Sequence, residues 1–287
     1  MFSERHSSFT ALTAAAARAA HLIVDNPPVI FDDALAAILL GDRADELIGY
    51  HRQHGSHLVL STARGQVTYR SRYTEESLAN AIRRGVAQYV VLGAGLDSFA
   101  YRSPLAERVA VFEVDHPATQ EWKRSRLSDA GHSVPPNVSF VPVDLESESL
   151  TSKLAASGFE LSSPAVVSWL GVTMYLTEPA IAAVLRELGR FARWTELVLD
   201  YMLPAELRDE IGNSYVEQVA PAAAERGEPW LTFFTSAQLS ALLAAHGFGR
   251  VRHVAQRDVG APDLWQRTDS LQPADLSMLA HAFARSG

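Results

Sequence analysis

The chain has 287 residues, of which 47% are apolar and 20% charged, a composition typical of a globular protein rather than a disordered one. Its formal net charge of −8, without a clustered basic patch, argues against a nucleic-acid partner, because phosphate contacts need grouped Lys and Arg. No cysteine is present, which excludes disulfides, thiolate catalysis and cysteine-based zinc sites.

The amino-terminal stretch predicts neither a signal peptide nor a membrane span. Met1 to Arg18 contains an alanine run but no long apolar segment behind a basic region, and this pattern predicts the start of a helix. No run of about 18 uninterrupted apolar residues occurs in the sequence, so no transmembrane helix is predicted. We therefore expect a cytoplasmic protein without a membrane partner.

The first zone of the chain, residues 1–84, is predicted to be mostly helical. Asp32 and Asp33 open a helical stretch over residues 34–40, and Gly41 ends it. Carboxylates suit the positive end of a helix, and glycine suits the position just beyond its last turn. Residues 75–84 predict a further helix, again ended by a glycine.

The second zone, residues 85–202, alternates short β-rich runs with helical stretches. The runs are almost continuously apolar, which is typical of parallel strands covered by helices on both faces of a sheet. They occupy residues 89–92, 109–112, 138–141, 165–169 and 197–199. A parallel α/β sheet is therefore the predicted core.

The third zone begins near Leu203. Residues 203–234 predict a helical insertion, and residues 235–287 are expected to complete the sheet. Thr235 and Gln238 form a capping box ahead of a helix that ends at Gly247, and a strand over residues 248–254 follows. Because no linker separates the zones, we interpret residues 1–287 as one domain.

The clearest chemical signal is a strand that runs into a glycine-rich turn at Gly93 and Gly95. Glycine lets the backbone adopt positive φ and approach a ligand closely. In doubly wound folds this turn lies at the carboxyl end of the first strand, where ligands bind. The dinucleotide fingerprint needs a third glycine, where this chain has Ser98, and this disfavours a dehydrogenase. S-adenosylmethionine (SAM) carries no pyrophosphate and fits the shorter turn.

Acidic residues follow the next two strands. Glu113 lies twenty residues after Gly93, the spacing at which a carboxylate reaches ribose hydroxyls, and Asp115 shares its side of the strand by alternation. After the third strand, Asp144 can accept a bond from an adenine amino group while Leu145 covers the ring. A helix N-cap by Asp144 is a compatible role. This succession of glycine turn and acids predicts a nucleoside-type ligand.

Residues 70–177 resemble the leucine carboxyl methyltransferase family, which includes many bacterial small-molecule O-methyltransferases. The resemblance rests on residues 72–76, 88–102, 112–117, 123, 143–145 and 171–177. It implies a Rossmann-like class I methyltransferase fold, with a seven-stranded, mostly parallel sheet whose last strand is antiparallel, amino-terminal helices and a helical insertion. It also implies that residues 85–202 form a SAM-binding core and that residues 203–234 cover the substrate.

The same resemblance implies roles for individual residues. Arg72 matches the arginine that pairs with the methionine carboxylate of SAM, Asp115 matches the ribose-binding acid, and Asp144 with Leu145 matches the adenine-binding pair. Many members carry a glutamate where this chain has Leu170, so a carboxylate that would face the amino group or sulfonium is missing. The full predicted cofactor-binding set is Arg72, Gly93, Ala94, Gly95, Asp97, Glu113, Asp115, Asp144, Leu145, Leu170 and Gly171.

The favoured function is methyl transfer from SAM to a carboxylate or hydroxyl of a small molecule, such as a secondary metabolite. A carboxylate needs no general base, whereas a phenol would benefit from one, with His116 and Tyr175 as candidates. The alternative is a non-catalytic SAM- or nucleoside-binding regulatory protein, which the missing glutamate keeps open. A homodimer stays open as well. No metal site is predicted, because no acid or thiol accompanies the evenly spaced His51, His54 and His57.

Overall fold

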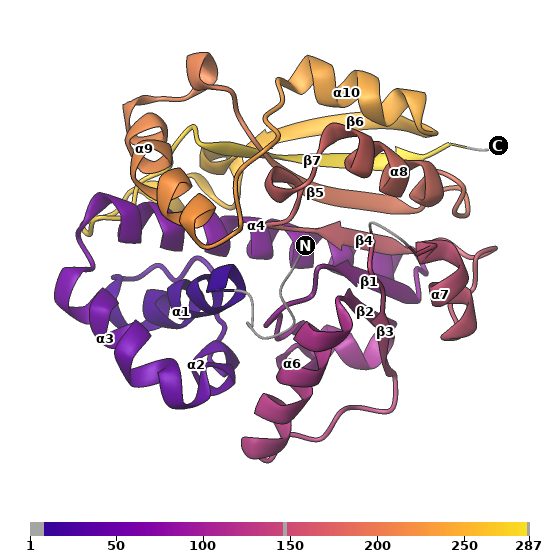
Figure 1. The fold of residues 1–287 in the computed structure, drawn as a ribbon, viewed down its shortest axis with the longest axis horizontal. Helices are drawn as coiled ribbons and strands as arrows, with labels where there is room; N and C mark the ends of the chain where they lie inside the picture. Colours follow the sequence, from indigo (N-terminus) through magenta and orange to yellow (C-terminus); the bar gives the residue numbers. More distant parts are fainter. Residues whose placement is uncertain (1–8, 146–147, 286–287) are drawn as a thin grey trace.

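A computed structural model describes residues 9–145 and 148–285 of the chain. Within these residues, seven strands form one mixed sheet (Figure 1). The strands are β1 (Gln88–Leu92), β2 (Ala110–Asp115), β3 (Val138–Pro142), β4 (Val166–Trp169), β5 (Glu196–Met202), β6 (Phe248–Ala255) and β7 (Ser277–Ala284).

The strand order is β3-β2-β1-β4-β5-β7-β6. Strands β1 to β5 run parallel to one another. Strand β7 runs antiparallel to both β5 and β6. This topology confirms the predicted class I methyltransferase sheet, including its antiparallel last strand. The order reverses at β1, which places a topological switch point beside the glycine turn.

Helices cover both faces of the sheet and fill the space beside it. The helices in chain order are α1 (Phe9–Val24), α2 (Leu35–Leu39), α3 (Ala44–His54), α4 (Leu58–Arg83), α5 (Phe99–Arg102), α6 (Pro117–Asp129), α7 (Leu150–Ala156), α8 (Glu178–Leu188), α9 (Glu210–Glu225) and α10 (Ser236–Ala245). The helix expected to start within Met1 to Arg18 is described from Phe9 onward, and residues 1–8 of that prediction lie outside the described part.

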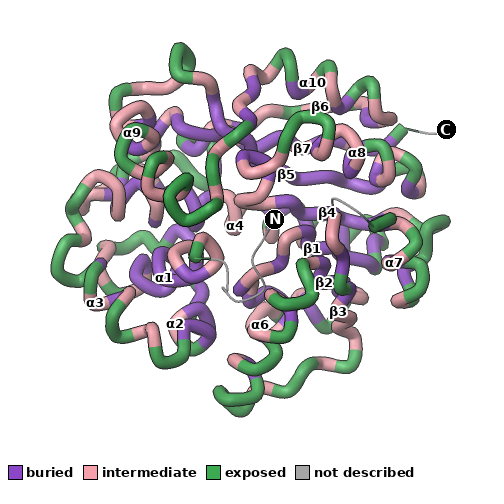
Figure 2. The backbone as a smooth tube through the Cα atoms, in the orientation of Figure 1, coloured by how far each residue is buried: buried purple, intermediate pink, exposed green. Residues whose placement is uncertain are grey.

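Alternation along the strands divides their side chains between two cores. Val90 and Leu92 of β1 join a core under α7, α8 and α10, whereas Tyr89 and Val91 join a second core under α4 and α5. Figure 2 shows the central strands β1, β4 and β5, which are buried along their whole length. Burial on both faces explains why the predicted runs are apolar at successive positions.

The amino-terminal helices lie beside the sheet rather than on it. Figure 1 shows α1, α2 and α3 grouped at the left, below α9. They share a small apolar core with Leu96 of the glycine turn and Leu127 of α6. Helix α4 is much longer than the helix predicted over residues 75–84, since it begins at Leu58, where the His57 ring accepts a hydrogen bond from the Val59 N–H at 3.3 Å. The shared core places α1 beside the glycine turn.

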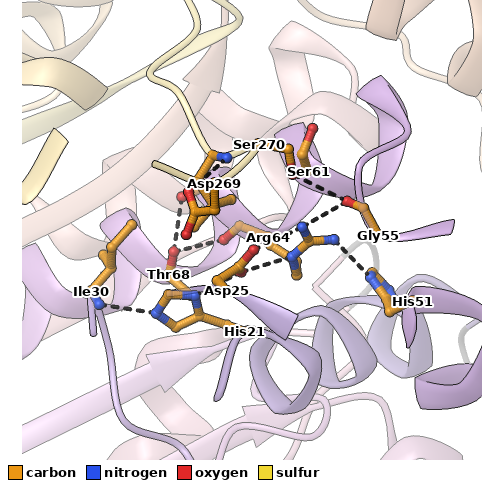
Figure 3. Close-up of polar contacts among 12 residues, drawn as sticks. His21, Asp25, Ile30, His51, Gly55, Ser61, Arg64, Thr68, Asp269 and Ser270 are labelled. Carbon is orange, nitrogen blue, oxygen red and sulfur yellow. Dashed lines mark hydrogen bonds and ion pairs between the residues drawn. The ribbon is translucent and has the colours of Figure 1, made fainter. Parts of the chain in front are cut away.

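A buried polar cluster joins α1 to α4 (Figure 3). The Asp25 carboxylate accepts two bonds from the Arg64 guanidinium, both of 2.8 Å, and a third contact from His21 Nδ1 at 2.9 Å. Arg64 also reaches His51 Nδ1 at 3.2 Å. His51 is thus bound to Arg64 while His57 caps α4. Within the described residues no group of three or more His, Asp or Glu could hold a metal ion, and no helix is long and apolar enough to span a membrane.

Candidate cofactor site

The glycine turn leaves β1 at the carboxyl edge of the sheet with two residues in the left-handed region. Gly93 has φ of 66° and Gly95 has φ of 44°, which only glycine adopts without strain. A Cβ atom on Gly93 would lie 2.5 Å from Val172, so the loop that follows β4 approaches the turn closely. The N–H groups of Gly93 and Ala94 bond the Val114 carbonyl of β2, at 2.8 and 3.1 Å. Contacts with β2 and with the loop after β4 therefore fix the conformation of the turn, which we call the cradle.

Asp115 ends β2 and anchors the turn. Its Oδ2 accepts the Gly95 N–H at 2.6 Å, and its Oδ1 accepts the His116 N–H at 2.7 Å. Burial raises the pKa of Asp115, while these two N–H groups act in the opposite direction. A carboxylate offers about four acceptor positions, and the Thr119 side chain uses a third, so one remains for a ribose hydroxyl. Its place at the carboxyl edge suits the ribose role.

Glu113 lies two residues earlier on β2 and faces Lys123 of α6. Its Oε2 lies 2.7 Å from the Lys123 Nζ, and both side chains are only 1% exposed. Burial raises the pKa of Glu113, while the Lys123 ammonium works to lower it. The carboxylate is thus held by an internal cation, and its predicted contact with the cofactor stays a prediction.

Gly171, after β4, forms the opposite wall of the site. Its φ is 72°, and its N–H donates to the Asp200 Oδ1 at 2.6 Å. The other Asp200 oxygen accepts Arg70 NH1 at 2.9 Å. A Cβ atom on Gly171 would lie 2.7 Å from Arg70 NH2, so the guanidinium rests against the bare backbone. Asp200 is fully buried at the end of β5 and fixes both the loop and the arginine.

Arg72 points away from Gly171, unlike Arg70. Its NH1 donates to the Ile30 carbonyl at 3.0 Å, and its Nε lies 2.8 Å from a Glu76 oxygen. It lines a surface groove of about 470 Å³ with Glu75 and Arg102. Positions two apart on a helix differ by roughly 200° in direction. The structure therefore brings Arg70, which the sequence did not single out, to the edge where Arg72 was expected.

The remaining predicted cofactor residues surround the same edge with different exposure. Asp97 accepts the Phe99 N–H at 2.9 Å on Oδ1 and so closes the turn. Asp144 follows β3 and is half-buried, while Leu145 packs against the main core. Leu170 packs among the apolar side chains around Tyr69. Asp144 does not cap the next helix, because Ser149 is the N-cap of α7.

Two residues were predicted as candidate bases, and they lie in different surroundings. His116 is exposed at the start of α6, where its Nδ1 accepts the Ala118 N–H at 3.3 Å. Tyr175 is half-buried in the short 3₁₀ helix Thr173–Tyr175 that follows β4. Burial raises the pKa of Tyr175, while hydrogen bonds with the Thr10 and Trp230 side chains act in the opposite direction. A phenol is neutral at pH 7 even without such a shift.

Tyr175 belongs to an aromatic cluster under the cover segment. The rings of Tyr215 on α9 and Trp230 stack with centroids 6.3 Å apart, and Phe233 packs into the same cluster. Thr10 of α1 donates to the Glu228 carboxylate, which ties the first helix to the cover. The apolar component predicted for residues 203–234 therefore lies beside the β4 end.

The cradle fits SAM chemically. Three glycines leave backbone space, the Asp115 carboxylate retains an acceptor position for a ribose hydroxyl, and Arg70 presents a fixed cation 2.7 Å from the position of a Gly171 Cβ. Nothing in this turn provides the helix N-terminus that a pyrophosphate uses, since α5 has only four residues.

A comparison with protein families decides the assignment. The model of the family described as leucine carboxyl methyltransferase matches residues 11–189. The chain belongs to this family. It is accordingly a SAM-dependent methyltransferase, and the predicted resemblance, enzyme class and cofactor are confirmed.

Relatives agree with this membership. A protein of Bacillus subtilis (strain 168), provisionally named a SAM-dependent methyltransferase, is 31% identical over 97% of this chain and 98% of its own length. One from Mycobacterium sp. (strain KMS), with a similar provisional name, is 34% identical over 58% of this chain and 53% of its own.

Solved structures confirm the fold alone. A methyltransferase-like protein of Thermobifida fusca YX has a TM-score of 0.61 at 15% identity, covering 87% of this chain and 92% of its own. A DUF574 family protein of Streptomyces avermitilis has a TM-score of 0.59 at 17% identity, covering 94% and 97%.

Proposed function

We propose that this methyltransferase transfers the methyl group of SAM to an oxygen atom of a small molecule, with a carboxylate as the favoured acceptor. The observation that carries the proposal is the place of Tyr175, a neutral hydroxyl in the short helix after β4 that packs against the aromatic residues of the cover segment. A neutral donor there can orient an acceptor oxygen that has free lone pairs, whereas an ammonium group has none to offer. An ionised carboxylate also needs no base.

On this proposal Asp115 holds the ribose, Asp144 and Leu145 hold the adenine, and the turn from Gly93 to Asp97 follows the amino-acid part. We assign the methionine carboxylate to Arg70 instead of Arg72, because only Arg70 borders Gly171. When bound, SAM supplies an electrophilic methyl group on a sulfonium. The residues of the chain contribute positioning and exclusion of water, which account for most of what such a displacement requires.

The cover segment provides the acceptor side. Tyr215, Trp230 and Phe233 form an apolar wall, which favours an acceptor with a flat or aliphatic body next to its reacting oxygen. His116 contributes little on this proposal, since it is exposed and its Nδ1 is engaged at the start of α6. The substrate partner is a small molecule, and residues 203–234 determine which one.

Calorimetric titration with SAM tests the cofactor assignment through a matched pair of variants. Arg70→Ala and Arg72→Ala remove the same side chain from one helix, two positions apart. We expect Arg70→Ala to weaken binding by about 1.5–3 kcal/mol, the range for a lost charge-assisted bond, and Arg72→Ala to change it by less than about 0.5 kcal/mol. The opposite ranking would return the role to Arg72, and wild-type protein that binds no SAM would defeat the proposal.

The acceptor chemistry is tested by the stability of the product. A small-acid and phenol panel is incubated with SAM labelled in the methyl group, and the product is then treated with dilute base. A methyl ester releases labelled methanol, whereas a methyl ether does not. We expect base-labile product and a roughly tenfold lower kcat/KM in Tyr175→Phe, from one lost hydrogen bond. Binding of SAM without transfer to any acceptor would favour the non-catalytic alternative.

A further inference from the structure

Ser98 replaces the third glycine of the dinucleotide fingerprint, and its side chain has a specific partner. The hydroxyl donates to the Asp33 Oδ1 at 2.6 Å, and Ser98 is 1% exposed. Asp33 precedes α2 in the amino-terminal helical part, 65 positions away in the chain. A residue that sequence comparison treats as a missing glycine is therefore a point of attachment.

Asp33 is the centre of a buried network. Its Oδ2 accepts Arg18 Nε at 2.7 Å, its Oδ1 accepts the Ala36 N–H at 3.1 Å, and Arg102 lies 3.4 Å away. Burial works to raise the pKa of Asp33, but Arg18 and Arg102 outweigh it and lower the pKa from its ordinary value. Asp33 is thus a fixed anion that holds two cations and one hydroxyl.

The same network holds the backbone of the glycine turn. Arg18 NH2 donates to the Leu96 carbonyl at 2.7 Å, directly after Gly95. Arg102 Nε donates to the Ser98 hydroxyl at 2.9 Å and also pairs with Glu75 of α4. Leu96 and Ser98 are therefore held from one side, while Asp115 holds Gly95 from the other.

The turn needs such external attachment for a physical reason. Glycine residues lose more conformational entropy than any other residue when they are fixed, and two of them have positive φ here. A long helix after the turn would normally propagate order into it, but α5 spans only Phe99–Arg102. Without attachment, fewer molecules would hold the turn in its binding shape, and the apparent affinity falls in proportion to that fraction.

We propose that Asp33 and Arg18 are positioning residues for the cofactor: they hold Leu96 and Ser98, and through them set the affinity of the glycine turn for SAM. This inference rests on the cofactor site proposed above. It gives the amino-terminal helices an indirect role in binding SAM, because Asp33 acts through Ser98 and Arg18. The competing explanation is a purely structural ion pair that stabilises the fold.

The chain contains a matched control for that explanation. The Asp25–Arg64 pair of Figure 3 is also a buried carboxylate–guanidinium contact in the amino-terminal helices, with both side chains 1% exposed. Its contacts are with α1, α3, α4 and the Gly55 carbonyl, and none of those partners belongs to the glycine turn. Asp25→Asn and Asp33→Asn therefore perturb similar pairs in different places.

The first measurement is hydrogen exchange of the turn amides, residues 94–99, without any ligand. We expect Asp33→Asn to speed their exchange at least tenfold relative to wild type, and Asp25→Asn to leave them unchanged. The second is calorimetric titration with SAM, where we expect Asp33→Asn to raise Kd at least tenfold and Asp25→Asn less than threefold. In turnover assays the KM for SAM rises while kcat at saturating SAM is largely retained.

Ser98→Ala and Ser98→Thr keep the inference testable if Asp33→Asn fails to fold. The alanine variant loses the bond to Asp33, and the threonine variant retains a hydroxyl, so we expect faster turn exchange and weaker SAM binding in the first and recovery in the second. Equal effects of Asp33→Asn and Asp25→Asn on both measurements would overturn the inference. Altered turn exchange in a protein whose wild type binds no SAM would instead overturn the proposed function and leave the attachment intact.

Discussion

The buried pair of Glu113 and Lys123 gives a sharp test of whether Glu113 acts inside the fold or on the cofactor. Lys123→Met removes the cation and leaves a carboxylate that is 1% exposed without its partner. Breaking a buried pair in this way typically costs about 3–5 kcal/mol. The carboxylate can escape part of that cost by taking up a proton, which limits the loss.

The stability that Lys123→Met loses depends on pH, because protonation of Glu113 costs less free energy at low pH. Protonating a carboxyl of ordinary pKa 4.5 costs about 3.4 kcal/mol at pH 7 and about 0.8 kcal/mol at pH 5. In Lys123→Met the folded pKa of Glu113 lies far above its unfolded value, so its contribution to stability is present at low pH and lost as pH rises. The free energy of unfolding of Lys123→Met should therefore fall by about 2.5 kcal/mol at this residue between pH 5 and pH 7. The fall should be smaller in wild type, where the Lys123 ammonium works to lower the pKa of Glu113.

Urea unfolding followed by circular dichroism at the two pH values measures this difference. The double variant Lys123→Met with Glu113→Gln has no carboxyl to titrate at this position, so the fall attributed to Glu113 should be absent from its free energy of unfolding. It should also bind SAM with a Kd within threefold of wild type if Glu113 acts only inside the fold. A single variant without pH dependence would refute the energetic reasoning, and a large loss of SAM binding in the double variant would support the cofactor contact predicted from sequence.

Two further predictions concern stability away from the cofactor. Burial and Arg64 lower the pKa of His51 to about 4 from 6.5, so the native state resists protonation and should lose about 2 kcal/mol between pH 7 and pH 5 at this residue. In urea unfolding, the free energy of unfolding of His51→Gln should lack this fall between pH 7 and pH 5. Trp194 is 59% exposed with φ of 72°, so Trp194→Asn should raise the unfolding free energy by about 1 kcal/mol, and an unchanged or lower Tm would contradict this.

The sheet could be predicted because its strands are buried on both faces. Four successive apolar residues at 89–92 leave no polar face, and that pattern fits a covered parallel strand. Strand β7 was implied only by family resemblance, since Ser277–Ala284 mixes small, polar and apolar residues and pairs with β5 and β6 in one antiparallel layer. Its burial is set by partners distant in the chain, which a local pattern does not contain.

The first half of α4 lies in the zone predicted to be mostly helical, but it was not singled out as part of the helix over residues 75–84, for a related reason. Thr68 and Arg64 are buried, so the helix lacks an apolar stripe over its first turns. The Thr68 hydroxyl bonds the Arg64 carbonyl one turn earlier at 2.6 Å, and the guanidinium is satisfied by Asp25. Polar side chains that satisfy one another inside the protein look, in sequence, like a solvent-exposed segment.

The positions of Arg70 and Arg72 show that a motif match does not determine which of two nearby arginines faces a site. Both are arginines, two positions apart, and both lie within residues 11–189, which the family model matches. Only the direction of α4 about its axis separates them, and contacts made by its other faces set that direction, such as Tyr69 Oη with Ser277 at 3.1 Å. A sequence match locates a helix more securely than it locates the face of that helix.

The departure at Leu170 has a physical resolution in the same wall of the site. Leu170 packs against Tyr69 and its apolar neighbours. A carboxylate is nevertheless present next to Gly171, because Asp200 of the adjacent strand is fully buried and bonded to both the Gly171 N–H and Arg70. Negative charge at the end of the central strands is therefore supplied by β5 instead of β4. Asp200 therefore fixes the Gly171 loop and Arg70 from inside the fold.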